Sequence, residues 1–159
     1  MIFSNTTPLI ALSSINQLHL LPELFNEIYV VNTVINECAK GGKIRVPDLT
    51  KLAWIKCIES KNYPHNPLLI SLDDGEKHTI EAALYYQADY TIIDEKLGRN
   101  FAEYLGLKVI GTLGILLKAK QQHKIVSFID CVKDMQSQGL RYNNQLVAKL
   151  ALLVNEQLK

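Results

Sequence analysis

The sequence predicts an α/β protein in which a parallel sheet of about five strands lies between two layers of helices, a three-layer α/β/α arrangement. Short apolar runs alternate with longer amphipathic segments along the chain. This alternation favours parallel strands, because a parallel neighbour is reached by a crossover long enough to contain a helix. The length of 159 residues fits a single domain over residues 1–159, and 48% apolar residues allow a sizeable core.

Five segments have the composition of short strands. Residues 27–31, Glu-Ile-Tyr-Val-Val, are rich in β-branched and aromatic residues, and residues 90–93, Tyr-Thr-Ile-Ile, resemble them. Each of the five is followed by a helical or turn-rich segment. The predicted strands are therefore residues 2–3, 27–31, 54–58, 90–93 and 108–110.

Residues that start and stop helices place the first three helices. Pro8 suits the first turn of a helix that runs to about Ser14. A short helix is expected at residues 20–25, and Gly41-Gly42 ends a third. The candidate caps are Thr6 or Thr7 for the first helix and Asn32 or Thr33 for the third.

Five more helices are expected in the second half of the chain. Asp73-Asp74-Gly75-Glu76 opens the clearest, whose apolar residues recur three and four positions apart as far as Gln87. In the last one, Leu146, Leu150 and Leu153 fall on one face. The remaining helices are expected at residues 96–104, 112–122, 125–137 and 143–157, with loops at residues 43–51 and 60–70.

Charge is unevenly distributed along the chain, although the net charge is only +1. Residues 1–95 hold seven Lys and Arg against twelve Asp and Glu, and residues 96–159 hold ten against four. A basic surface beside an acidic pocket suits a nucleic-acid backbone held next to a metal ion. Solvated helix faces that happen to differ in sign give the same pattern.

Cysteine spacing and hydropathy favour a cytoplasmic protein. Cys38, Cys57 and Cys131 lie far apart without C-x-x-C spacing, so we expect reduced thiols and no zinc site. No apolar run approaches the roughly 18 residues that span a membrane. The first residues lack a basic leader before an apolar stretch, so we expect no signal peptide.

Four polar residues lie in otherwise apolar αβ surroundings. Asn5 and Asp94 follow predicted strands, and Glu37 and Glu76 lie in predicted helices. The carboxyl ends of adjacent parallel strands share one edge of the sheet, so we expect these side chains to meet there. Carboxylates brought together repel, and a divalent cation relieves the repulsion. Magnesium held by such oxygens binds phosphate and activates water.

Each of the four has a simpler explanation when it is taken alone. Asn5 and Asp94 fit helix caps, Glu76 fits a first-turn acid favoured by the helix dipole, and Glu37 fits a solvent-facing helix position. Only their coincidence at one predicted sheet edge favours a functional site.

The same residues lie in motifs that resemble those of PIN-domain nucleases, in particular a prokaryotic subfamily related to VapC-type toxins. In that subfamily the central helix begins with a Gly-Glu pair, as Gly75-Glu76 does here, and a Gly-Thr-Leu-Gly stretch follows the last strand, as residues 111–114 do. Each motif is short, but their order is more specific, and the resemblance covers residues 1 to about 145. The matching segments are residues 4–10, 34–37, 72–76, 92–95, 97–99 and 109–120.

The resemblance implies a Mg²⁺- or Mn²⁺-dependent endoribonuclease with Asn5, Glu37, Glu76 and Asp94 as its catalytic and metal-binding positions. It implies that Glu76 and Asp94 ligate metal directly or through water, and that Glu37 orients the attacking water or a second metal. Residues expected to support these ligands are Thr6, Asp74, Glu95 and Thr112. Lys96 and Arg99 are expected to meet the RNA phosphate, and toxins of this type pair with a small antitoxin and often form homodimers.

Asn5 departs from the resemblance, because the family pattern most often has Asp at this position. An amide oxygen coordinates Mg²⁺ but brings no negative charge. The alternative to a ribonuclease toxin is therefore a weakened or inactive PIN-like module that binds RNA or protein.

Other α/β chemistries need residues that this chain lacks. A receiver domain needs an Asp at the end of its central strand, where Cys57-Ile58-Glu59 is a poor substitute. A haloacid-dehalogenase-type phosphatase needs Asp-x-Asp where Asn5-Thr6-Thr7 stands. Dinucleotide binding needs a G-x-G-x-x-G turn, which residues 111–114 do not supply.

Overall fold

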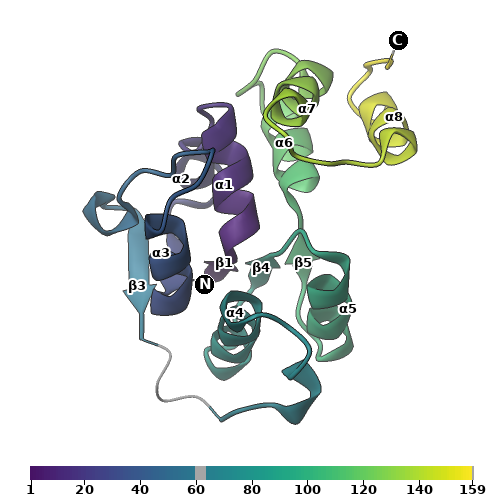
Figure 1. Ribbon diagram of the computed structural model, residues 1–159. Helices are drawn as coiled ribbons and strands as arrows, with labels where there is room; N and C mark the ends of the chain where they lie inside the picture. The colour runs from purple at the N-terminus through teal and green to yellow at the C-terminus, as the bar shows by residue number, and fades with distance from the viewer. Residues whose placement is uncertain (60–63, 159) are drawn as a thin grey trace.

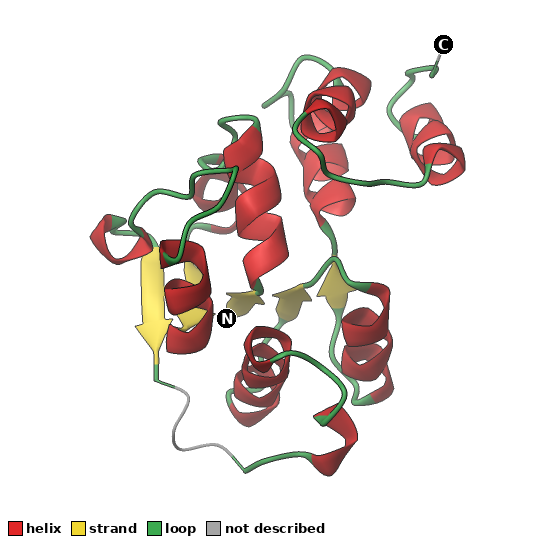
Figure 2. Ribbon diagram, viewed as in Figure 1, coloured by secondary structure: helices red, strands yellow, loops and turns green. Residues whose placement is uncertain are grey.

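Five parallel strands form one sheet in the computed structural model, which describes residues 1–59 and 64–158. The strands run in the order β3-β2-β1-β4-β5, so the chain builds the sheet outward from β1 in both directions. Figure 1 labels these strands and Figure 2 shows them in yellow between the red helices. Their bounds are β1 Ile2–Ser4, β2 Ile28–Val31, β3 Ile55–Ile58, β4 Tyr90–Ile92 and β5 Val109–Ile110.

Helices cover both sides of the sheet, which confirms the predicted α/β/α arrangement. In Figure 1, α4 and α5 lie below the strands, α1, α2 and α6 lie above them, and α7 and α8 extend the upper side. The helices are α1 Thr6–Ser14, α2 Leu20–Phe25, α3 Asn32–Ala39, α4 Asp74–Tyr85, α5 Lys96–Tyr104, α6 Thr112–Gln121, α7 Phe128–Ser137 and α8 Asn144–Leu152.

Two groups of buried apolar side chains hold the layers together. The larger contains Phe3 of β1 with residues of α1, α2, α6, α7 and α8. The smaller contains Ile93, which follows β4, together with Ile80 of α4 and Ala102 of α5. Side chains alternate across a strand, and the consecutive pairs Val30 and Val31, and Ile92 and Ile93, are all fully buried. The sheet is therefore buried on both faces, as parallel sheets require.

Several predicted helix ends shift in the structure. The residue before α1 is Asn5 and the residue before α3 is Val31, so the caps predicted for these helices, Thr6 or Thr7 and Asn32 or Thr33, lie inside them instead. α7 begins at Phe128, because the Ser127 side chain accepts a hydrogen bond from Asp130 N and fixes the start there. The predicted loops contain short 3₁₀ turns at Leu49–Lys51 and Pro67–Leu69, and residues 60–63 lie outside the described part.

The last helix packs through a different face from the one that the leucine spacing indicates. Val147 and Ala151 of α8 are buried, whereas Leu146 is largely exposed. α8 also ends at Leu152, five residues earlier than predicted. Leu146 and Leu150 line a cavity described below, Leu150 also packs against the core, and Leu153 is exposed.

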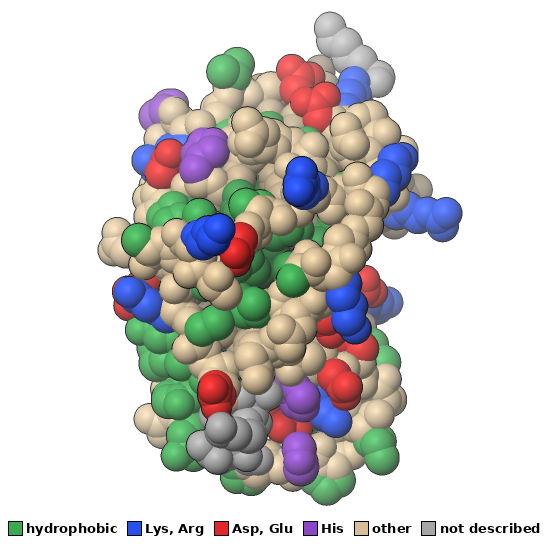
Figure 3. All heavy atoms as spheres, turned by 60° about the vertical axis from the view of Figure 1, so that its left-hand side comes forward, with side chains coloured by type: hydrophobic (Ala, Val, Ile, Leu, Met, Phe, Trp, Pro, Cys, Tyr) green, Lys and Arg blue, Asp and Glu red, His purple; other side chains and the backbone are tan. Residues whose placement is uncertain are grey.

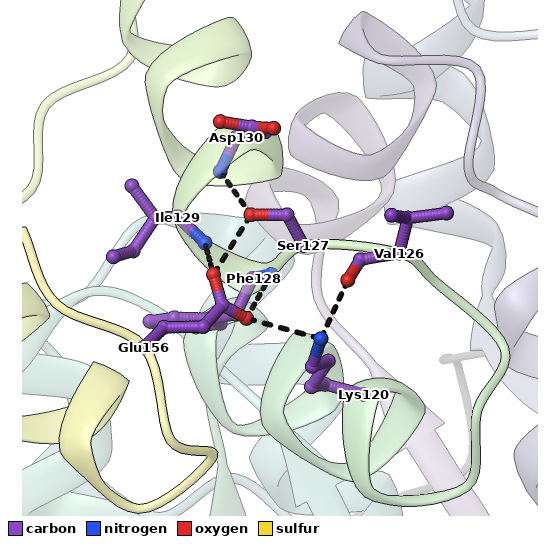
Figure 4. A network of polar contacts seen from close by, with 7 residues as sticks. All are labelled: Lys120, Val126, Ser127, Phe128, Ile129, Asp130 and Glu156. Carbon is purple, nitrogen blue, oxygen red and sulfur yellow. Dashed lines mark hydrogen bonds and ion pairs between the residues drawn. The ribbon is translucent and has the colours of Figure 1, made fainter.

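Glu156, in the segment after α8, ties the end of the chain to the start of α7 (Figure 4). Its carboxylate accepts hydrogen bonds from the Ser127 hydroxyl at 2.7 Å and from the backbone N–H groups of Phe128 and Ile129 at 2.8 and 3.1 Å. Lys120 Nζ lies 3.6 Å from the same carboxylate. We call this group the C-terminal latch. It satisfies unpaired N–H groups at a helix N-terminus, where a carboxylate is also favoured by the helix dipole.

No helix in the described residues is long and apolar enough to cross a membrane.

Candidate functional site

The candidate site lies where the order of the strands reverses direction, between β1 and β4. The two strands pair in parallel with Ser4 opposite Ile92, and Asn5 N donates to Ile92 O at 3.0 Å. Asn5 and Asp94 therefore follow neighbouring strands at one edge of the sheet. Ligands of open parallel sheets bind outside the carboxyl ends of the strands at such a reversal.

Asn5 occupies the N-cap position of α1 without capping the helix through its side chain. The residue is only 3% exposed, and Oδ1 is buried without a hydrogen-bond partner. An unpaired buried carbonyl oxygen costs about 1–3 kcal/mol. The simpler explanation of Asn5 as an ordinary helix cap therefore does not hold, and its oxygen is available to a ligand.

Glu37 reaches the same edge from α3. Thr6 Oγ1, one residue after Asn5, donates a hydrogen bond to Glu37 Oε2. The other neighbour is Gly75, one residue before Glu76, where an added methyl group would lie 2.5 Å from Glu37 Oε2. Glu37 therefore contacts one residue that follows Asn5 in the sequence and one residue that precedes Glu76.

Glu76 lies in the first turn of α4 and is 5% exposed. Its Oε1 is buried without a hydrogen-bond partner. Burial, and then the charge of Asp73, raise the pKa of this carboxyl from 4.5 to about 7, and the charge of Glu95 adds to the shift. A buried carboxylate near two others is the arrangement that a cation stabilises most.

Asp94 is held by Thr112, the first residue of α6. Thr112 N donates to Asp94 Oδ1 at 2.7 Å, and Thr112 Oγ1 donates to Oδ2 at 2.6 Å. Burial raises the pKa of Asp94, while the Thr112 hydrogen bonds and the charge of Arg99 act in the opposite direction. Both oxygens of this carboxylate are thus fixed in direction, and each keeps a second lone pair for a ligand.

Each of the three carboxylates packs against a glycine from another element. A methyl group at Gly98 in α5 would lie 3.0 Å from Glu76 Oε1, and one at Gly111 would lie 3.0 Å from Asp94 Oδ1. With Gly75 against Glu37, the pairs are 37/75, 76/98 and 94/111. The glycines leave the space that the carboxylates occupy, and no sequence motif alone shows this pairing.

A cavity of about 750 Å³ opens beside Asp94. Its polar wall includes Thr7, Glu95 and the basic residues Lys96, Arg99 and Arg141. Its apolar wall comes from α6 and α8, where the leucine face of α8 contributes Leu146 and Leu150. A negatively charged group lying in this cavity would lie between the three basic residues and Asp94.

The structure brings most of the predicted supporting residues to the site and leaves one out. Thr6 and Thr112 bind carboxylates directly, and Glu95 acts on Glu76 through its charge. Asp74 is exposed and lies 3.6 Å from Lys77 Nζ, so it does not join the group.

Asp73 takes the place that was expected for Asp74. Its Oδ1 accepts from Glu76 N at 2.9 Å, and its charge raises the pKa of Glu76. Arg141 and Tyr142 also reach the site from the segment between α7 and α8. Burial, and then the charge of Asp94, raise the pKa of Tyr142. The position of Asp73 just before α4 could have identified it as a helix cap, but no sequence signal points to Arg141 and Tyr142.

The donor set fits a hard divalent cation in part. No group of three or more His, Cys, Asp or Glu side chains in the described residues is arranged to hold a metal ion. Mg²⁺, however, is bound in proteins through one or two carboxylates and several waters rather than in a full protein cage. The partnerless oxygens Asn5 Oδ1 and Glu76 Oε1, with Asp94 nearby, meet that smaller requirement.

A comparison with protein families gives one match. A family model described as a PIN domain matches residues 1–156 of this chain. No curated protein and no solved structure matches it.

Proposed function

The chain belongs to the PIN-domain family, and from this premise we propose that it is a metal-dependent ribonuclease that hydrolyses RNA phosphodiester bonds. The fold is a nuclease-type fold, and residues 1–159 would act as one domain. The observation that carries the proposal is the pair of buried, partnerless oxygens, Asn5 Oδ1 and Glu76 Oε1, at the reversal point of the sheet.

The proposed metal ligands are Glu76 and Asp94, with the Asn5 amide oxygen as a neutral third. Bound Mg²⁺ or Mn²⁺ would supply a Lewis acid for the phosphate and lower the pKa of a bound water. Thr112 keeps the Asp94 carboxylate in one orientation, and the carboxyl of Glu76 carries a raised pKa in the absence of a cation. Glu37, oriented by Thr6, would hold the attacking water.

Basic residues beside Asp94 support an RNA substrate. Arg99 acts on Asp94 through its charge and lines the cavity with Lys96. A guanidinium binds a phosphate through two parallel hydrogen bonds, so Arg99 is the proposed phosphate ligand and Lys96 a weaker one. These contacts position RNA without reading its sequence.

The finer assignment follows the resemblance to VapC-type toxins. We propose the toxin component of a toxin–antitoxin pair, with a small antitoxin and a second copy of the chain as partners and the cytoplasm as its location. The rival function is a weakened PIN-like module that binds RNA or protein, and the neutral Asn5 is what favours it.

The decisive experiment measures RNA cleavage with Mn²⁺ by the wild-type chain, Asn5→Asp and Asp94→Asn. We expect measurable wild-type cleavage, a gain of about tenfold in Asn5→Asp because an added carboxylate binds the ion more tightly, and loss in Asp94→Asn. Equal activity in the wild type and Asn5→Asp would show that the amide is not limiting. RNA binding without cleavage in the wild type and in Asn5→Asp would favour the module.

A further inference from the structure

A second buried carboxylate lies on α4, away from the candidate site. Glu81 is 3% exposed, and neither of its carboxylate oxygens has a hydrogen-bond partner. It lies five residues after Glu76, which turns its side chain about 140° around the helix axis from that of Glu76. Glu81 therefore points away from the candidate site to which Glu76 belongs.

Glu81 is among the residues that line a cavity of about 480 Å³ between α4 and the segment 64–67, and both of its carboxylate oxygens are shielded from solvent. The walls are largely apolar and come from Pro64, Pro67, Leu84 and Tyr85. Leu68 and Ile70, which follow this wall in the sequence, are 48% and 86% exposed. We call this cavity, with Glu81 at its base, the Glu81 pocket.

The chain itself offers this carboxylate little compensation in the described residues. The group within ion-pairing distance is His65, whose Nδ1 lies 3.5 Å from Glu81 Oε2 and whose side chain is 78% exposed. The Asn66 side chain, also in the lining, already accepts a hydrogen bond from Leu68 N at 3.0 Å. Histidine side chains lie beside acidic ones at the lower end of the face in Figure 3. A buried carboxylate without a firm cationic partner is costly, so a cation from outside would bind favourably.

We propose that the Glu81 pocket binds the guanidinium group of an arginine side chain from a partner protein. The guanidinium presents parallel N–H donors that match both oxygens of one carboxylate. It is also less strongly hydrated than an ammonium ion, so it enters a partly dry pocket more readily than lysine does. The proline and leucine walls suit the aliphatic stem of the side chain.

Other ligand classes fit the pocket less well. A structural or catalytic zinc ion takes three or four protein ligands, whereas this lining supplies one carboxylate and one imidazole. A phosphate would be repelled by Glu81. The exposed apolar residues beside the pocket fit a protein interface, in which a charged anchor at the centre is surrounded by apolar contacts that exclude water.

The test is an NMR titration of the full-length, ¹⁵N-labelled chain with three blocked peptides, Gly-Arg-Gly, Gly-citrulline-Gly and Gly-Lys-Gly. Citrulline matches arginine in shape but is neutral. We expect the arginine peptide to shift the amide signals of His65, Asn66 and residues 81–85, and to bind at least tenfold more tightly than the citrulline peptide and more tightly than the lysine peptide.

Variants separate recognition from loss of the fold. Glu81→Gln should weaken arginine binding at least tenfold, and Glu103→Gln, an exposed carboxylate on α5, should leave it unchanged. If Glu81→Gln does not fold, His65→Lys serves instead, because it alters an exposed residue and places a cation beside Glu81. We expect His65→Lys to reduce arginine binding by a similar factor.

Four results would overturn the proposal. They are equal binding of the arginine and citrulline peptides, amide shifts confined to residues outside the pocket, undiminished binding by a folded Glu81→Gln variant, and amide shifts of the pocket with Zn²⁺ but not with arginine.

Discussion

Two glutamates in different regions of the molecule have surroundings with opposite effects on their carboxyl groups. Glu156 in the C-terminal latch accepts three hydrogen bonds and lies next to Lys120. Burial alone would raise the pKa of Glu156, but the hydrogen bonds and the lysine charge outweigh it, and the pKa is lowered. Glu76 at the sheet edge has an oxygen without a partner and acidic neighbours, and its pKa is raised to about 7.

The difference indicates what each carboxylate is for. The latch is complete within the chain, so its carboxylate stabilises the fold and has little capacity left for a ligand. The carboxylates at the sheet edge lack compensating partners within the chain, and such uncompensated charge is typical of functional sites. Substitutions should therefore separate the two regions, with effects on cleavage at one and on stability at the other.

The largest expected effect is on cleavage at the sheet edge. Glu76→Gln should lower Mn²⁺-dependent RNA cleavage by about 100-fold or more, equivalent to about 2.7 kcal/mol of transition-state stabilisation. The melting temperature measured with a chelator present should stay the same or rise, because a neutral amide relieves the repulsion from Asp73 and Glu95. Cleavage within fivefold of the wild type would remove Glu76 from the proposed site.

The next effect is on stability at the latch. Glu156→Ala should cost about 2–3 kcal/mol in urea unfolding, since it removes a helix cap and leaves the Phe128 and Ile129 N–H groups without partners. Cleavage by the folded fraction should change less than twofold. Gln157→Ala, a neighbouring exposed position, is the control. A loss below about 0.5 kcal/mol for Glu156→Ala would mean that the latch carries little stability.

The smallest expected effect is on the pH dependence of the free energy of unfolding, to which Glu76 and Glu156 contribute with opposite signs. Between about pH 4.5 and 7 the folded protein keeps the Glu76 proton that the unfolded chain has lost, so the free energy of unfolding falls as pH rises through this window. Glu156 acts in the opposite sense, because its lowered pKa stabilises the fold above its unfolded pKa and this contribution is lost as pH falls.

Metal-free unfolding at pH 5 and pH 7.5 measures this contrast. The wild type should lose about 2 kcal/mol more than Glu76→Gln as pH rises, and Glu156→Gln should lose less than the wild type as pH falls from 5 to 3. The same slopes in both variants and the wild type would show that neither carboxylate is shifted.

The fold was predictable because its signals are local. Strand composition and helix periodicity each depend on a few neighbouring residues, and the parallel order follows from their alternation. The same rule placed Asn5 and Asp94 at strand ends on a shared edge, and in the structure they follow the neighbouring strands β1 and β4.

The residues that were not predicted correctly depend on the direction of side chains around a helix and on packing between segments far apart in the sequence. A shift of one position at a helix start redirects the side chain, which separates Asp73, the N-cap with extended backbone, from Asp74, the first residue of α4. The same sensitivity put Leu146 on a cavity wall and Val147 in the core. Arg141 and Tyr142 reach the site only because α7 and α8 fold back over α6, and no local pattern records that.

The site depends on the absence of a side chain at the three glycines that face the carboxylates. Gly75 lies in α4, Gly98 lies in α5 and Gly111 precedes α6, yet each leaves room for an acid on another element. A chain that kept every acid and exchanged one of these glycines for alanine would still match the acidic motif in a sequence search. One added carbon would nonetheless crowd a carboxylate, so the glycines are as informative as the acids about whether a related sequence keeps this arrangement.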